Sequence, residues 1–297
     1  MLNGLVLNVQ KNFYFVKTEG GILQCTLKGK LYKEKENVNS PVVVGDYVLV
    51  EKSEYGRGII NEILPRKSKF SRKVAGSRSN EQILAANIDQ VIITCSVKDP
   101  KYKLNTIERY IVAAHAGNIR PIICFNKVDL INFNEIEGEL AQLQNHGYQV
   151  ICTSTSTGEG VDVLKETLKN KISIFSGSSG VGKSSLINLI QEEKTALTGD
   201  VGNTTGKGRH TTTSTHLYEL PFGGMILDSP GMREFALIDS EDGIKDSFAE
   251  IEELAKNCKF RGCSHSHEPK CAVKDALENG EIEERRYKNF LKLARSR

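Results

Sequence analysis

A glycine-rich segment in the second half of the chain has the residue types and spacing of a phosphate-binding loop. Gly177, Gly182, Lys183 and Ser184 fit the pattern G-x-x-x-x-G-K-[ST], between an expected strand and an expected helix. Glycines let backbone amides surround phosphates, the lysine neutralises them, and the serine hydroxyl can bind Mg²⁺. An ordinary Gly/Ser turn before a helix is the alternative. The residues expected to bind the nucleotide here are Gly177, Ser178, Ser179, Gly180, Val181, Gly182, Lys183, Ser184 and Ser185.

A second motif, Asn126-Lys127-Val128-Asp129, directly follows the apolar run PIICF and would select the base. The run predicts a strand of a parallel sheet, and ligands bind at the carboxyl ends of such strands. The Asp129 carboxylate can accept hydrogen bonds from two donors of guanine, a pattern that adenine lacks. Ser154, at the end of the next expected strand, would contact the guanine carbonyl. Each motif is weak alone, but together with the phosphate loop they predict GTP as the ligand.

A third motif, D-S-P-G at 228–231, ends the expected strand MILDS. Asp228 could hold Mg²⁺ through water, and the Gly231 amide could contact the γ-phosphate. The preceding Gly/Thr-rich segment, 199–215, has neither helical nor strand periodicity, so we expect it to be ordered by the γ-phosphate and Mg²⁺. One of its three consecutive threonines should complete the magnesium shell, and we favour Thr212. The expected magnesium ligands are Ser184, Thr212 and Asp228.

The residue that would orient the attacking water is not the usual one. Met232 follows the third motif where many GTPases carry a glutamine, and a thioether cannot position water. We therefore expect slow intrinsic turnover and a role for His210, since imidazole can orient or accept from water. A structural loop histidine is the alternative. The candidate catalytic residues are His210, Thr212 and Gly231.

A Cys/His cluster near the C-terminus has the spacing of a metal site. Cys258, Cys263, His265 and Cys271 form C-x₄-C-x-H-x₅-C, with His267 as an alternative to His265. Three thiolates and one imidazole complete a tetrahedral Zn²⁺ shell, so we expect a structural zinc ion; reduced, unligated cysteines are the alternative. The remaining cysteines lie in expected strands and read as small buried hydrophobes: Cys25, Cys95, Cys124 and Cys152.

The elements around these motifs fall into three groups, which predict a multidomain protein. Residues 1–65 contain about five short strands, including an apolar run over 42–51, and suit a small β-barrel of the oligonucleotide-binding type or an SH3-like barrel. From 87 onward strands and helices alternate, as in a doubly wound α/β domain; one helix would run from the N-cap Asn105 to the C-cap Gly117. After about 240 the chain reads as helical. The expected domains are an RNA-binding barrel over 1–70, a basic linker over 71–86, an α/β P-loop domain over 87–238 and a mainly helical zinc-binding domain over 239–297.

Charge is segregated along the 297-residue chain. The net charge of +3 combines +6 over 1–75, −8 over 76–255 and +5 over 256–297. The stretch from Arg66 to Arg78 holds six basic residues and no acid, which favours a polyanion such as nucleic acid over a solvated linker. No apolar run approaches the ~20 residues of a membrane-spanning helix, and the N-terminus does not read as a secretory signal. We therefore expect a cytoplasmic protein without membrane contact.

The motif order is rotated relative to ordinary GTPases, in which the phosphate loop precedes N-K-x-D. Chain termini usually lie close together, so such a rotation can preserve the fold. The sequence resembles the circularly permuted GTPases of the RsgA (YjeQ/YloQ) type. The resemblance covers nearly the whole chain and rests on the N-terminal barrel, ILAANIDQV, FNKVD, GSSGVGKSS, GRHTTT, DSPGMREF and the terminal Cys/His cluster.

This resemblance implies an oligonucleotide-binding barrel, a permuted GTPase domain and a zinc tail, and it favours His265 over His267. It also implies hydrolysis of GTP to GDP and phosphate during late maturation of the small ribosomal subunit, with that subunit and its rRNA as partners and stimulators. We expect a monomer. Two other functions stay open: a P-loop ATPase or kinase, and an RNA-binding module with a degenerate nucleotide site. Because the third motif directly precedes the C-terminal module, we expect nucleotide state to reach that module.

Overall fold

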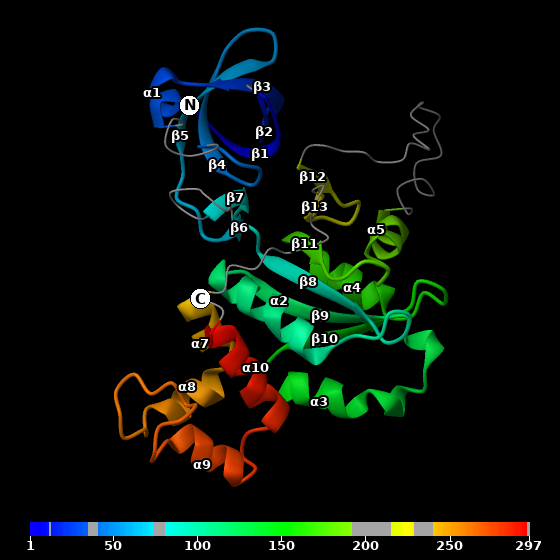
Figure 1. Cartoon of the computed structure of the whole chain (residues 1–297). Coiled ribbons are helices and arrows are strands. Elements are labelled where there is room, and N and C mark those ends of the chain that lie inside the picture. The colour runs from blue at the N-terminus through cyan, green and yellow to red at the C-terminus, as the bar shows by residue number, and fades with distance from the viewer. Residues whose placement is uncertain (12, 35–40, 74–80, 192–214, 229–239, 296–297) are drawn as a thin grey trace.

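The structure is a computed structural model, and it shows three parts in chain order: a barrel, a central sheet and a group of helices (Figure 1). In Figure 1 the barrel lies at the top, the sheet in the middle and the helices below. None of the described helices has the length and apolar character to cross a membrane. The described residues are 1–11, 13–34, 41–73, 81–191, 215–228 and 240–295.

The N-terminal part is a closed barrel of five strands. Strand order is β1-β2-β3-β5-β4, β4 returns to pair with β1, and β3 and β5 run parallel. Val6, Tyr14 and Val16 fill its interior with other apolar side chains. Closure of β1 on β4, with a helix between β3 and β4, confirms the oligonucleotide-binding type over the SH3-like alternative. The elements are β1 (Leu2–Gln10), β2 (Phe13–Thr18), β3 (Gly21–Leu27), α1 (Gly29–Glu34), β4 (Tyr47–Lys52) and β5 (Arg57–Ile63).

The apolar run over 42–51 is only partly a strand, because β4 begins at Tyr47. Gly45 has a φ of +88°, a conformation that favours glycine, and a Cβ there would overlap the Ala86 carbonyl. The buried Asp46 carboxylate accepts from Arg66 Nε at 2.7 Å and Nη2 at 2.8 Å. Arg66, counted above among cations for a polyanion, is therefore paired inside the protein.

A two-stranded hairpin lies in the segment expected to be a basic linker. Strand β6 (Lys69–Lys73) pairs antiparallel with β7 (Glu81–Ala86). Phe70 and Ala85 are buried in the main cluster of the central domain. The hairpin thus packs on the central domain, and its apolar positions are hard to recognise in sequence because basic residues stand between them.

The central part is a doubly wound sheet of order β10-β9-β8-β11-β13-β12, parallel except for the antiparallel strand β12. Val91 and Ile93 of β8 pack with residues of α2 and α3, whereas Ile92 packs with α4 and α5 on the other face. Alternating strands and helices are confirmed; β12 has no counterpart among the expected strands. The elements are β8 (Gln90–Ser96), α2 (Leu104–Ala116), β9 (Arg120–Asn126), η1 (Val128–Leu130), η2 (Phe133–Glu135), α3 (Glu137–Asn145), β10 (Gln149–Thr153), α4 (Val161–Leu168), β11 (Ile172–Ser176), α5 (Lys183–Gln191), β12 (His216–Glu219) and β13 (Met225–Asp228).

The expected N-cap of α2 was wrong, while its C-cap is confirmed. Lys103 occupies the N-cap position without a side-chain cap, and Gly117 ends the helix. Asn105 lies in the first turn, where its Oδ1 accepts from Arg285 Nη1 at 3.0 Å. A residue that could cap this helix is instead a partner of a distant arginine.

The C-terminal part is a group of helices that packs against α2 (Figure 1). Gly243 of α7 approaches the backbone of α2 so closely that a Cβ would contact the Val112 carbonyl. Val112 also belongs to the apolar cluster of this part, with Ile244, Phe248 and Phe290. The helices are α7 (Glu241–Ser247), α8 (Ala249–Ala255), α9 (Ala272–Glu278) and α10 (Glu284–Arg295).

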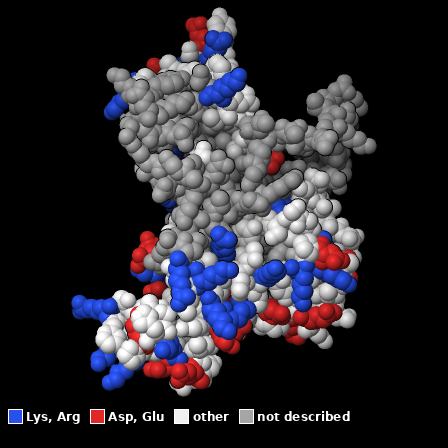
Figure 2. Space-filling view, viewed as in Figure 1, with Lys and Arg blue, Asp and Glu red and all other residues white. Residues whose placement is uncertain are grey.

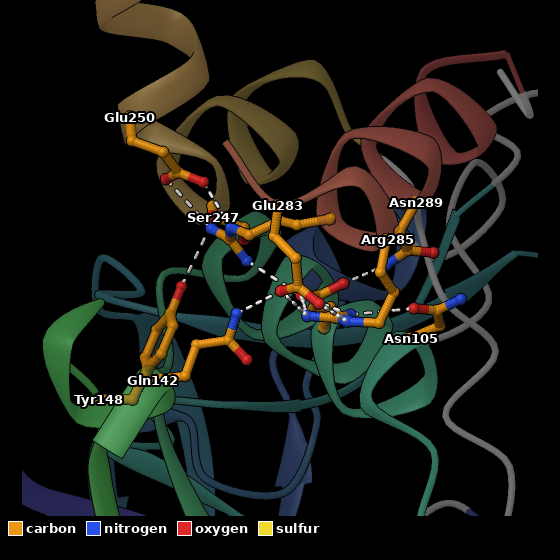
Figure 3. Close-up of polar contacts among 10 residues, drawn as sticks. Asn105, Gln142, Tyr148, Ser247, Glu250, Glu283, Arg285 and Asn289 are labelled. Carbon is orange, nitrogen blue, oxygen red and sulfur yellow. Dashed lines mark hydrogen bonds and ion pairs between the residues drawn. The ribbon is translucent and has the colours of Figure 1, made fainter. Parts of the chain in front are cut away.

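A buried polar network joins α10 to α2 (Figure 3). Glu108 of α2, only 3% exposed, accepts from Arg285 and Arg286 at 3.1 Å each and from Asn289 Nδ2 at 2.5 Å. Arg286 also donates to Glu250 of α8 and to the Ser247 carbonyl. Three donors therefore compensate one buried carboxylate, which fixes α10 on the central domain.

Candidate nucleotide and zinc sites

The structure brings the second motif and the phosphate loop together, although 55 residues separate them in the chain. Asn126, fully buried at the end of β9, donates from Nδ2 to the Val181 carbonyl at 2.9 Å. Its Oδ1 accepts from Thr153 Oγ1 at 3.1 Å, which fixes the amide orientation. Gly182 has a φ of +97°, and a Cβ there would overlap the Asn126 amide. One buried amide therefore links the segment expected to bind the base to the loop expected to bind the phosphates.

The phosphate loop has the backbone that its glycines predict. Gly177 and Gly180 have φ of +140° and +80°, and a Cβ on Gly177 would overlap the Thr94 carbonyl. Lys183 Nζ donates to the carbonyls of Gly177 at 2.6 Å and Ser178 at 2.7 Å, so the ammonium lies over the loop. Helix α5 begins at Lys183, and the hydroxyls of Ser184 and Ser185 in its first turn are exposed. Amides at a helix start, a fixed cation and exposed hydroxyls are suited to a phosphate chain with Mg²⁺.

At the base end, Lys127 has a left-handed φ of +65° and its Nζ donates to the Asp99 carbonyl. This turn places Asp129 in η1, where it is exposed beyond the end of β9. The Ser154 hydroxyl is buried and accepts from the amides of Ser156 and Thr157 at 3.2 Å each. Ser154 therefore fixes its own loop, and Asp129 is the carboxylate that faces out of the sheet edge.

The third motif begins at the end of β13, where Asp228 is half-buried. Asp228 lies opposite His216 in the β12–β13 pairing. Burial lowers the pKa of His216, and the Asp228 carboxylate opposes that effect. Hard oxygen donors such as Ser184 Oγ and the Asp228 carboxylate suit Mg²⁺. Three further predicted site residues lie outside the described residues: His210, Thr212 and Gly231.

A cavity of about 260 Å³ adjoins the phosphate loop on its α2 side. Ser178 and Val181 of the loop line it with Ser96, Tyr102 and Thr106. The base-side residues do not line it, so this space differs from the position that the second motif assigns to a nucleobase.

The four predicted zinc ligands converge on one point. All their ligand atoms lie within 4.8 Å of one another. The Cys258 and Cys271 sulfurs are 3.8 Å apart, and His265 Nδ1 lies 3.6 Å from the first and 3.4 Å from the second. Bonds of about 2.3 Å to sulfur and about 2.0 Å to nitrogen place tetrahedral ligands about 3.5–3.8 Å apart. These distances and donors fit a Zn²⁺ ion.

The geometry separates the two histidines that the sequence leaves open. His265 is buried with its Nδ1 toward the sulfurs, whereas His267 is exposed with its Nε2 4.0 Å from Glu268. The Tyr287 hydroxyl donates to the His265 carbonyl at 2.5 Å, so α10 supports the cluster. Burial and the neighbouring thiols raise the pKa of Cys263 to about 12, so a thiolate there requires a cation.

The other cysteines have the surroundings of small apolar residues. Cys25, Cys95 and Cys124 are buried and Cys152 is half-buried. Burial raises the pKa of Cys25 to about 11 and that of Cys124 to about 12. These thiols are held protonated and unreactive.

Two polar groups that connect the parts were missed from sequence. Glu108 lies on the apolar face of its helix, between Ile107 and Ile111. This position among apolar residues was the available sequence signal that the carboxylate is buried. Asn8 stands in the apolar first strand and meets His216 from far along the chain. Neither the sequence around Asn8 nor the sequence around His216 indicates that the two residues meet.

The fold and site define a P-loop GTPase with circularly permuted motifs. The sheet is doubly wound, the phosphate loop follows β11, and the base-side asparagine reaches that loop from β9, earlier in the chain. Residues 63–238 match the family model for the RsgA GTPase, and residues 3–60 match that for the RsgA N-terminal domain. The chain belongs to the RsgA GTPase family.

Relatives and solved structures match nearly the whole chain. A small ribosomal subunit biogenesis GTPase RsgA of Caldanaerobacter subterraneus is 38% identical, over 99% of this chain and 95% of that protein. The protein of that name from Actinobacillus pleuropneumoniae is 41% identical, over 99% and 85%. YjeQ from Thermotoga maritima superposes with a TM-score of 0.75 at 33% identity, covering 98% of this chain and 96% of that one. The circularly permuted GTPase YloQ gives 0.72 at 30%, covering 98% and 93%.

Proposed function

We propose that this GTPase acts in late maturation of the small ribosomal subunit, in the cytoplasm, and that its turnover is stimulated by that subunit. The relatives carry small ribosomal subunit biogenesis in their names. The observation that supports the nucleotide part is the buried hydrogen bond between Asn126 and the Val181 carbonyl, which joins the N-K-x-D motif to the G-x-x-x-x-G-K-S loop. GTP and GDP are therefore the proposed ligands.

In this proposal each end of the nucleotide has its own residues. The Asp129 carboxylate accepts from guanine, the Lys127 stem covers the ring and the loop after Ser154 meets the guanine carbonyl. The phosphate loop residues Gly177–Ser185 surround the phosphates, with Lys183 as the neutralising cation. Val128 completes the turn that carries Asp129.

The magnesium ion, when bound, neutralises charge on the phosphate oxygens. Ser184, Asp228 and Thr212 are the proposed holders, with Asp228 acting through water. The Gly231 amide donates to the γ-phosphate, and His210 orients the attacking water because Met232 cannot.

The barrel and the C-terminal module are the proposed RNA-binding parts. Tyr55, 94% exposed in the β4–β5 turn, and the exposed Phe13 at the start of β2 can stack on bases. Figure 2 shows Lys and Arg side chains gathered over α2 and α10. Arg109 of α2 and Lys288 and Lys292 of α10 are exposed cations of these helices. Stacking groups and phosphate-binding cations support an RNA platform.

Base selection is tested with Asp129→Asn in the full chain. An amide cannot accept from both guanine donors, so we expect GTP binding to weaken about tenfold to hundredfold and xanthosine nucleotide binding to tighten. Fluorescent nucleotide titrations measure both. The matched control is Asp162→Asn, an exposed carboxylate on α4, which should leave both affinities unchanged. Equal preference for guanine and adenine nucleotides in the unmodified protein would contradict the proposal.

The ribosomal role is tested by GTP turnover with small subunits, large subunits or bare RNA. We expect small subunits to stimulate most, and His210→Ala to lower the stimulated rate. An unchanged stimulated rate in that variant removes His210 from the mechanism. Equal stimulation by large subunits contradicts the proposed partner.

A further inference from the structure

The barrel and the central sheet are joined at the hairpin that carries Asp228. β1 pairs antiparallel with β12 at Asn8 and His216, which makes the barrel strands and the central strands one sheet (Figure 1). Leu5 and Leu7 of β1 lie in the same buried cluster as Leu217 and Leu227 of the hairpin. A side of the barrel is therefore packed directly on β12 and β13.

One buried polar contact lies within this apolar junction. Asn8 is only 7% exposed, and its Nδ2 lies 2.7 Å from His216 Nδ1. Among the described residues, Asn8 Oδ1 has no hydrogen-bond partner. Burying an amide in apolar surroundings is unfavourable unless it is hydrogen-bonded. The contact thus penalises any register of β1 on β12 other than the observed one.

His216 and Asp228 occupy the same end of the hairpin. His216 is the first residue of β12 and Asp228 the last of β13, and they are direct partners in the antiparallel register. Side chains of such partners lie on one face about 4.5–5.5 Å apart at Cβ. The proposed magnesium ligand Asp228 therefore adjoins the residue that Asn8 contacts.

We propose that Asn8, a residue of the barrel, is a positioning residue of the nucleotide site: through His216 it holds the end of the β12–β13 hairpin where Asp228 meets Mg²⁺. This inference rests on the proposed role of Asp228. Loss of this support affects only the metal-dependent part of nucleotide binding, because Asn126 holds the base-side motif and the phosphate loop. Loss of the Asn8 contact weakens the contribution of Mg²⁺ to nucleotide binding without weakening metal-free binding.

The junction also supplies a matched control. Lys17 Nζ of β2 lies 2.8 Å from Glu219 Oε1 of β12, and both side chains are about half exposed. This ion pair joins the same two parts but lies at the other end of β12 from Asp228. Removing this ion pair tests whether a general disturbance of the contact between the barrel and the central sheet changes the contribution of Mg²⁺ to nucleotide binding.

The experiment measures binding of a fluorescent GDP analogue to the full chain, in Mg²⁺ and in EDTA. The ratio of the two affinities isolates the metal. We expect Asn8→Leu to reduce this ratio about threefold to tenfold, the equivalent of one hydrogen bond, with the EDTA affinity unchanged. His216→Leu should reduce it similarly, and the double variant no further, because both remove one contact. Lys17→Ala should keep the ratio of the unmodified protein. Asn8→Ala probes the same contact should leucine unfold the barrel, as judged by thermal melting.

The outcomes separate this inference from the proposed function. If Asp228→Asn lowers the ratio and the Asn8 variants do not, the positioning role is overturned while the magnesium site stands. Equal losses in Mg²⁺ and in EDTA overturn it as well, since they indicate general damage. An unchanged ratio in Asp228→Asn removes the magnesium assignment itself, and this inference with it.

Discussion

The barrel and the C-terminal helices are both attached to the central domain, but by different physical means. The barrel junction at β12 combines apolar packing by Leu5 and Leu7, one strand pairing, one neutral hydrogen bond and an exposed ion pair. The C-terminal junction buries a carboxylate, Glu108, with two arginines. Apolar contact tolerates small displacements, whereas buried charges require close geometry to offset their desolvation. The comparison indicates a rigid C-terminal attachment and a barrel attachment that responds mainly to side-chain volume.

The largest expected effect is on the C-terminal side, from loss of a zinc ligand. Cys271→Ser should abolish zinc binding and unfold residues 258–271 together with α9, because structural zinc contributes about 10–16 kcal/mol in peptides. Metal content and hydrogen exchange of α9 measure this. Cys152→Ser, at a half-buried thiol of β10 that is not part of the cluster, is the control. Retained protection of α9 without zinc would show that apolar packing alone holds this module.

The next effect is at the buried carboxylate. Glu108→Gln leaves Arg285 and Arg286 without their shared negative partner, so we expect a loss of about 3–5 kcal/mol in unfolding free energy, seen by denaturant titration. Glu284→Gln removes an exposed pair with Lys288 on the same helix and should cost no more than about 1 kcal/mol. Equal effects of the two variants would show that the buried Glu108 network contributes no more than an exposed ion pair.

The third prediction concerns the apolar packing between the barrel and the central domain. Leu7→Ala should cost about 2–5 kcal/mol through the cavity it leaves, with little dependence on salt concentration. Ile22→Ala, at an exposed barrel position, should be nearly neutral. Denaturant titrations at low and high salt compare them. A strong salt dependence for Leu7→Ala would contradict an apolar junction.

The smallest expected effect is a pH dependence at the C-terminal junction. Although burial opposes it, hydrogen bonds from Gln142 and Arg285 lower the pKa of Glu283 below the ordinary 4.5. A carboxyl with a lowered pKa in the folded state stabilises the fold above the unfolded value and loses this contribution as pH falls through the folded value. Glu283→Gln should therefore destabilise slightly at pH 7, by less than about 1 kcal/mol, and the difference should shrink below about pH 4. A difference that grows on acidification would reverse the sign assigned here.

Much of this architecture could be predicted from the sequence because the signals are local. The buried strands, the phosphate loop and the Cys/His spacing each lie within one short segment. What failed or was missed depends on distant partners. Asn105 lies inside the first turn of α2 and accepts from Arg285, Arg66 pairs with Asp46, and Asn8 meets His216 across 208 residues. Such pairings exist only in the assembled fold.

The two-sided burial of β1 has a consequence for how the chain is made. Val6 faces the barrel interior while Leu5 and Leu7 face the central cluster, so one strand serves two cores. Its partners in the β12–β13 hairpin are translated some two hundred residues later. Strand β1 is thus synthesised well before the hairpin that completes its packing, and a nascent chain stalled before residue 216 carries Leu5 and Leu7 without their hairpin neighbours.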